Sequence, residues 1–369
     1  MLYTFFLYFI FGNNLNPPSS EFNICLPLDT KHEAYLSEII SDRNNNEYLW
    51  RYVKEFNQLE VYEVETGQLL HSKIVESTGP NGVNRFFALK PISEEEVYII
   101  DLTGELVKYH MTKGVLTKRN IIKGLPEIHS LIVKSSGALR DIFIYSDELY
   151  LPISPRNPPF YQNKNDFKFY IKHNLLTGEN LLLEANFPKS YFKNGLRGFN
   201  YHSAYDGKGN LVILPNDYSE AYAIDLKSSK LSKIEINLLK NGKFKKWEGV
   251  TQADKKIIQD FYTYAVNVGL VYDKYRNLYY RFLWPGANEY KYENKVKFEQ
   301  IRNYYVPFFQ IEIYDKDFNL KKVEVMPDFV YNTGHFVISK QGLCLMANHP
   351  ENPDNEEDVV TFHVYDFSK

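Results

Sequence analysis

The sequence predicts an all-β fold, a six-bladed β-propeller of four-stranded antiparallel blades. One hairpin design, two alternating strands around a polar turn, recurs at 61–70, 221–231 and 311–320, with a looser copy at 169–182. A second strand–turn–strand segment precedes hairpins at nearly equal intervals, at 205–214, 272–281 and 338–347. Aromatic residues make up 16% of the chain, and their flat rings favour strands. Because one hairpin cannot bury its apolar face alone, such repeats are expected to pack around a common axis.

Each repeat holds two hairpins and therefore four strands, which we name A to D from the axis outward. Taken in chain order, the six expected blades span approximately 44–75, 83–122, 129–187, 200–238, 267–327 and 334–367. The first blade has the weakest A strand. The last blade ends where its D strand should begin.

The missing D strand is expected to come from the other end of the chain. The apolar segment 21–27 belongs to none of the six blades, and we predict that it pairs with 359–365. This pairing closes the ring and leaves no long unpaired edge between the first and last blades. A single propeller domain then covers 21–369.

The first 20 residues are predicted to be an apolar, signal-like segment and a linker. Residues 2–11 are apolar throughout, but a helix needs about 20 such residues to span a bilayer. We therefore expect an exported protein, in the periplasm or at the cell surface, with no transmembrane span. Whether this segment is cleaved, or holds the protein at a membrane, is left open.

The two cysteines, Cys25 and Cys344, are expected to be free and mostly buried. In the predicted last blade they lie on strands D and B. Strand C separates them, so they are roughly 9.5 Å apart at about 4.8 Å per strand. A disulfide needs Cα atoms within about 7 Å.

Composition and motifs narrow the possible functions. The net charge of −3 gives no field that would attract nucleic acid. We find no nucleophile elbow, zinc-binding His-Glu-x-x-His, phosphate loop or dinucleotide fingerprint. We therefore predict no cofactor and no nucleic-acid partner, and we expect a monomer.

The connections between strands differ in length on the two faces of the predicted ring. The A–B and C–D turns are short, whereas several D–A and B–C connections are long, and 251–261 within one of them is predicted to be a helix. Long loops on one rigid face are where binding usually occurs. We expect this long-loop face to bind a small molecule, a glycan or a protein.

The repeated strand motifs resemble a known family. The segments are Tyr222-Ala-Ile-Asp-Leu226, Tyr314-Asp-Lys-Asp-Phe-Asn-Leu320 and Asn277-Leu-Tyr-Tyr-Arg-Phe282. With these the chain resembles, over 21–369, six-bladed β-propeller proteins of unknown function from Bacteroidota, many of them predicted exported lipoproteins. The resemblance implies the fold and export, and it brings no activity with it. No lipobox-like cysteine follows the apolar segment here.

The best candidate site lies at the starts of the innermost strands, where side chains enter the central funnel. Five polar residues fall near one level: Arg85, His129, His202, Asn267 and His335. Such groups suit an anion, a sugar or a metal, although we predict no metal site. Alternatively, they satisfy backbone groups and line a water-filled channel.

A second candidate is the aromatic stretch 283–292, which contains Trp284, together with Arg302. Rings beside amide and guanidinium groups suit a glycan or a peptide, or they pack the loop against its own blade. The first hypothesis for function is thus an exported binding protein. The alternative is a hydrolase or lyase acting on carbohydrate or peptide, with His202 or His335 as general base and Arg85 holding an anionic group.

Overall fold

The computed structural model describes most of the predicted blades. The described residues are 17–25, 36–84, 86–101, 103–121, 129–131, 141–155, 168–186, 201–216, 219–234, 236, 264–286, 309–331, 334–349, 351–356 and 359–368. The predicted helix at 251–261 lies outside them.

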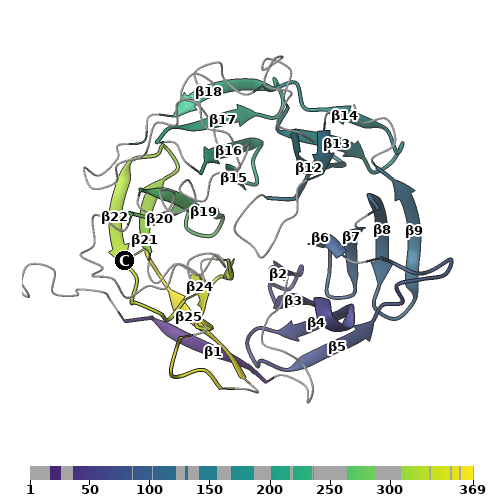
Figure 1. Cartoon of the computed structure of the whole chain (residues 1–369), viewed down its shortest axis with the longest axis horizontal. Coiled ribbons are helices and arrows are strands. Elements are labelled where there is room, and N and C mark those ends of the chain that lie inside the picture. The colour runs from purple at the N-terminus through teal and green to yellow at the C-terminus, as the bar shows by residue number, and fades with distance from the viewer. Residues whose placement is uncertain are drawn as a thin grey trace, which may run out of the picture.

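Six antiparallel sheets stand around one axis, which confirms the predicted six-bladed propeller (Figure 1). The first blade consists of β2 (Leu36–Ser41), β3 (Glu47–Val53), β4 (Gln58–Glu63) and β5 (Leu69–Ile74), with the short 3-10 helix η1 (Lys54–Phe56). The second consists of β6 (Phe86–Pro91), β7 (Glu96–Asp101), β8 (Glu105–His110) and β9 (Gly114–Asn120). The third consists of β10 (His129–Leu131), β11 (Phe143–Tyr145), β12 (Glu148–Pro155), β13 (Tyr170–Asn174) and β14 (Asn180–Leu182).

The remaining three blades complete the ring. The fourth consists of β15 (Tyr201–Tyr205), β16 (Asn210–Pro215), β17 (Ala221–Asp225) and β18 (Lys230–Ile234). The fifth consists of β19 (Val266–Asp273), β20 (Leu278–Trp284), β21 (Gln310–Asp315) and β22 (Leu320–Val325). The sixth consists of β23 (Phe336–Ile338), β24 (Leu343–Met346), β25 (Val359–Tyr365) and β1 (Ser20–Cys25).

The ring is closed by the N-terminal strand, as the sequence predicts. Strand β1 pairs antiparallel with β25, with Phe22 opposite Phe362, and these two rings stack at 4.8 Å. Figure 1 shows the purple β1 outside the yellow β25. Chain ends far apart in sequence therefore share one sheet.

The cysteine prediction is confirmed where the structure describes it. Cys344 is free and buried. Burial raises the pKa of its thiol to about 12, so the thiol stays protonated at neutral pH. Cys25 ends β1, and its side chain lies outside the described part of the chain.

Two inner strands differ from the sequence-based description. In the first blade strand A is β2, which begins at Leu36, before the predicted start at 44. In the third blade strand A is split, because β10 and β11 pair with opposite ends of β12. Inner strands face the channel, so polar residues such as Ser37 and Glu38 break the apolar alternation that marks a strand.

The core lies between neighbouring blades. Tyr52 of the first blade stacks on Phe86 of the second at 4.2 Å, and Phe282 of the fifth stacks on Phe336 of the sixth at 4.3 Å. Both faces of each sheet are covered in this way, because successive side chains point to opposite neighbours. Burying each such ring stabilises the fold by roughly 1.5–3 kcal/mol.

The turns are built around acidic side chains. Asp42, Asp206 and Asp315 each accept, through Oδ1, the backbone N–H of the asparagine four residues later, at 2.8 to 2.9 Å. This pattern explains the recurring aspartate and asparagine in the short turns, since aspartate bonds to nearby backbone N–H groups.

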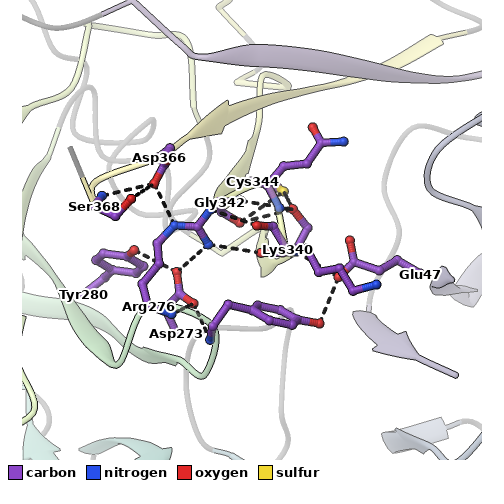
Figure 2. A network of polar contacts seen from close by, with 12 residues as sticks. Glu47, Asp273, Arg276, Tyr280, Lys340, Gly342, Cys344, Asp366 and Ser368 are labelled. Carbon is purple, nitrogen blue, oxygen red and sulfur yellow. Dashed lines mark hydrogen bonds and ion pairs between the residues drawn. The ribbon is translucent and has the colours of Figure 1, made fainter. Parts of the chain in front are cut away.

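A polar network joins three blades on the face that carries the short turns (Figure 2). The Arg276 guanidinium donates to Asp366 Oδ1 (2.8 Å), to Asp273 Oδ2 (3.2 Å) and to the Lys340 carbonyl oxygen (2.9 Å). The Lys340 backbone N–H in turn donates to Glu47 Oε1 at 2.9 Å. These bonds hold the turn after β19 against the sixth and first blades.

Candidate ligand site in the central channel

A cavity of about 340 Å³ lies in the central channel. Its wall takes residues from the inner strand of every blade, β2, β6, β11, β15, β19 and β23, or from segments next to them. Gly207 and Lys274 in the wall belong to A–B turns, so the cavity extends to the face that carries the short turns. Its volume is within the range of small-molecule sites.

Much of the wall is apolar. Phe143, Leu270, Val271, Phe336 and Val337 all contribute to it. Phe143 is fixed by stacking on Tyr205, with ring centroids 4.1 Å apart. A ligand with an apolar body would therefore lose water-exposed surface on entering, which is worth about 25 cal/mol per Å².

The wall also holds an ion pair. The Lys90 ammonium, near the end of β6, contacts Glu38 Oε1 on β2, and both side chains are about four-fifths buried. Burial acts against the charge on Lys90, but Glu38 and Asp141 outweigh it, so the pKa of Lys90 is raised. The Asp141 carboxylate also accepts the backbone N–H of Tyr205 at 3.0 Å. Lys90 is therefore charged and already matched by carboxylates.

Lys274 is a second cation in the wall, and unlike Lys90 it has no ion pair in the described structure. The structure gives its ammonium no hydrogen bond or ion pair within the described residues, and it lies over the ring of Tyr275, 4.9 Å from the centroid. Burial lowers the pKa of Lys274, and repulsion from Lys90 is the next largest cause. In Figure 1 the strands β6 and β19 lie on opposite sides of the channel. The two ammonium groups thus approach from opposite blades.

The wall also contains a buried hydroxyl. Ser37 on β2 is 9% exposed, and its Oγ has no hydrogen-bond partner in the described part of the chain. A buried hydroxyl without a partner costs on the order of 1–3 kcal/mol. A bound polar group would recover that cost.

Two of the predicted site residues meet, but inside the protein. His202 and Asn267 are both fully buried, and His202 Nε2 donates to the Asn267 carbonyl oxygen at 2.9 Å. The Asn267 side-chain oxygen accepts two bonds from Arg281, at 2.8 and 2.6 Å. Arg281 in turn pairs with Glu312 at 2.9 Å. These residues form a polar network between the fourth and fifth blades.

His335 lies just before β23, between the sixth and first blades. Its Nδ1 is buried, and none of the described residues forms a hydrogen bond with it. Burial, and then the positive charge of Arg51, lowers the pKa of His335 to about 4. The ring is therefore neutral at pH 7.

The side chains of the remaining four predicted site residues are either buried between blades or outside the described part of the chain. Trp284 ends β20 and is buried in the cluster between the fifth and sixth blades. His129 opens β10, although its side chain is outside the described part. Arg85 and Arg302 also lie outside the described residues. A ligand-binding role for these seven residues stays a prediction.

Sequence reasoning missed four of the polar residues of the cavity wall, Ser37, Glu38, Lys90 and Lys274. A signal was present, because Lys90 interrupts an otherwise apolar inner strand and Lys274 directly follows another. Lysines at the same end of two inner strands would have indicated convergence on the axis.

Six antiparallel sheets, five of four strands and one whose inner strand is split in two, surround a cavity on their common axis and define this molecule as a six-bladed β-propeller with a central pocket. The family model "Domain of unknown function (DUF4221)" matches residues 28–322, and the chain belongs to that family.

Two solved structures from Bacteroides are similar. A DUF4221 family member from Bacteroides vulgatus is 19% identical with a TM-score of 0.79, and the match covers 95% of this chain and 97% of that one. A Bacteroides fragilis protein described as a predicted exported protein is 12% identical with a TM-score of 0.50, covering 95% and 96%. No curated protein matches the sequence. These similarities show the fold alone.

Within the described ranges, no helix is long and apolar enough to cross a membrane. The same part of the chain holds no group of three His, Cys, Asp or Glu side chains arranged to bind a metal.

Proposed function

We propose that this protein is a ligand-binding propeller and that its ligand occupies the cavity in the central channel. The observation that carries the proposal is the cavity itself, which combines apolar walls with the lysine ammonium of Lys274 and the hydroxyl of Ser37, both without partners in the described structure. Convergent polar groups in an apolar pocket are the usual features of a small-molecule site.

The rigidity of the wall supports this proposal. Inner strands from six blades supply the lining, and the Arg276 network fixes the turn that carries Lys274. A preformed site spends little binding energy on ordering side chains. The channel therefore suits a ligand of small size, whereas the long-loop face stays the predicted surface for a glycan or protein.

The test is a thermal-shift screen of small molecules on the wild-type chain and on Val271→Trp, which places a large ring in the cavity. Leu116→Trp, on the exposed outer strand β9, is the matched control. A ligand at a hundred times its Kd stabilises the folded state by about 2.7 kcal/mol. We expect hits on the wild type and on Leu116→Trp that disappear in Val271→Trp. Hits that persist in Val271→Trp would overturn the channel as the site.

We also propose that the protein is exported and acts as a monomer. The apolar segment 2–11 supports export, as does the description of the Bacteroides fragilis relative. Cell fractionation with N-terminal sequencing of the mature protein tests the first point, and light scattering tests the second. A cytoplasmic protein with an intact first residue would contradict export.

A further inference from the structure

We propose that the channel cavity selects a small monocarboxylate, an apolar organic acid whose carboxylate lies between Lys274 and Lys90 and accepts a hydrogen bond from Ser37. This inference rests on the proposed function and adds the chemical class of the ligand. Charge, hydrogen bonding and the apolar wall each support it.

The first support is the position of Lys274. Lys90 has Glu38 as its ion-pair partner, whereas Lys274 has no ion pair among the residues described, and Glu47 and Glu38 attract it only from beyond ion-pair distance. The strongest charge effect on Lys274 is repulsion from Lys90 across the channel. An anion between the two ammonium groups would replace this repulsion with two attractions, and hydrogen bonds to charged groups are the strong ones.

The second support is the buried Ser37 hydroxyl. Ser37 and Glu38 both belong to β2 and both line the cavity, as does Lys90, the ion-pair partner of Glu38. Among the described residues the buried Ser37 hydroxyl has no hydrogen-bond partner. A carboxylate has two oxygens and can accept from an ammonium and from a hydroxyl together.

The charge balance of the wall argues against a ligand with two negative charges. The lysines Lys90 and Lys274 are offset formally by Glu38 and Asp141. A dianionic phosphate would bring two charges close to both carboxylates, whereas a monocarboxylate meets the one ammonium that lacks a partner. The rest of the wall, with Phe143 and Phe336, suits an apolar body.

The experiment compares four probes that share one apolar chain: hexanoate, hexan-1-ol, hexylamine and hexyl phosphate. Isothermal titration at low salt measures each Kd on the full wild-type chain, on Lys274→Met and on Lys274→Arg. Lys316→Met is the control, because Lys316 is exposed in the turn between β21 and β22 and pairs with its neighbour Asp317. Thermal unfolding of each variant verifies folding.

We expect the wild type to bind hexanoate more tightly than the other three probes. Lys274→Met should weaken hexanoate about tenfold, to the level of hexan-1-ol, while Lys274→Arg and Lys316→Met retain the preference. Tighter binding of hexyl phosphate or hexylamine would overturn the inference. So would equal affinities for hexanoate and hexan-1-ol, or no binding of any probe.

The Val271→Trp variant distinguishes a wrong ligand class from a wrong binding site. If hexanoate and hexan-1-ol bind equally and Val271→Trp abolishes both, the channel is the site and only the carboxylate preference is wrong. If Val271→Trp leaves the binding of every probe unchanged, the channel itself is not the site.

Discussion

At the scale of single residues, His335 shows how burial decides the role of a titrating group. The folded protein lowers the pKa of His335 from 6.5 to about 4 through burial and the nearby Arg51. The unfolded chain therefore binds more protons between these two values, so stability rises with pH in that window. The contribution is full above pH 6.5 and is lost as the pH falls to 4, and it amounts to about 3 kcal/mol.

The variant His335→Asn removes this titration. We expect urea unfolding of the variant to depend less on pH between 6.5 and 4 than that of the wild type. His71→Asn on the outer strand β5 is the matched control and should behave as the wild type does. If His335→Asn retained the full pH dependence of the wild type, the assignment to His335 would be wrong.

At the scale of elements, two blades repeat one buried polar arrangement. In the first, Arg51 on β3 pairs with Glu60 on β4, and in the fifth, Arg281 on β20 pairs with Glu312 on β21. A tyrosine two residues after each glutamate donates to the same carboxylate, at 3.0 Å from Tyr62 and 2.5 Å from Tyr314. All the charged groups are essentially unexposed.

Removing one charge of such a buried ion pair should lower the free energy of unfolding more than replacing both charged residues by apolar ones. Glu312→Gln leaves the Arg281 charge buried without its carboxylate, and we expect a loss of about 3–5 kcal/mol in the free energy of unfolding. The double variant Arg281→Met with Glu312→Leu removes both charges and should lose less than Glu312→Gln alone. Chemical denaturation measures both. A double variant less stable than the single one would show that the ion pair stabilises the blade interface on its own.

The elements that sequence analysis predicted well are those with strong local signals. The hairpins 61–70 and 221–231 keep an apolar alternation and a turn residue, so β4–β5 and β17–β18 were found from the pattern. Inner strands carry less of this signal, because one edge of each strand faces the channel. For that reason β2 was missed, and with it Ser37 and Glu38 of the cavity wall.

The positions of the candidate histidines along their strands could be predicted from spacing, but the directions of their side chains could not. His202 was expected in the funnel, but its side chain is buried against Asn267 between two blades. A shift of one residue along a strand exchanges the two faces of a sheet. Spacing alone therefore located these residues on the inner strands without deciding where their side chains point.

At the scale of the whole molecule, ring closure brings one glycine of the first blade against the N-terminal strand. Gly67, in the turn between β4 and β5, has φ +68°, and a Cβ there would lie 2.2 Å from the Asn23 carbonyl oxygen of β1. The first blade thus packs directly against the strand that completes the sixth. Gly114 is the first residue of β9, directly after the corresponding turn, with φ +79° and nothing within 4 Å of an added Cβ.

Alanine variants of these two glycines distinguish the cost of backbone strain from the cost of displacing β1. Gly114→Ala should cost about 1–2 kcal/mol, because alanine is strained at positive φ. Gly67→Ala should cost clearly more, and it should expose β1 to hydrogen exchange, because its Cβ displaces the strand. Equal losses of stability, with β1 still protected, would mean that closure does not depend on this contact.

A small organic acid bound inside the channel would be visible by crystallography. The most direct test is a crystal structure of the full chain grown with 6-bromohexanoate, whose bromine is located by anomalous scattering. We predict one bromine peak inside the channel beside Phe143 and Phe336, with the carboxylate between Lys274 and Lys90. Bromine peaks only on the outer strands or the long-loop face, with the channel free of the probe, would contradict the account.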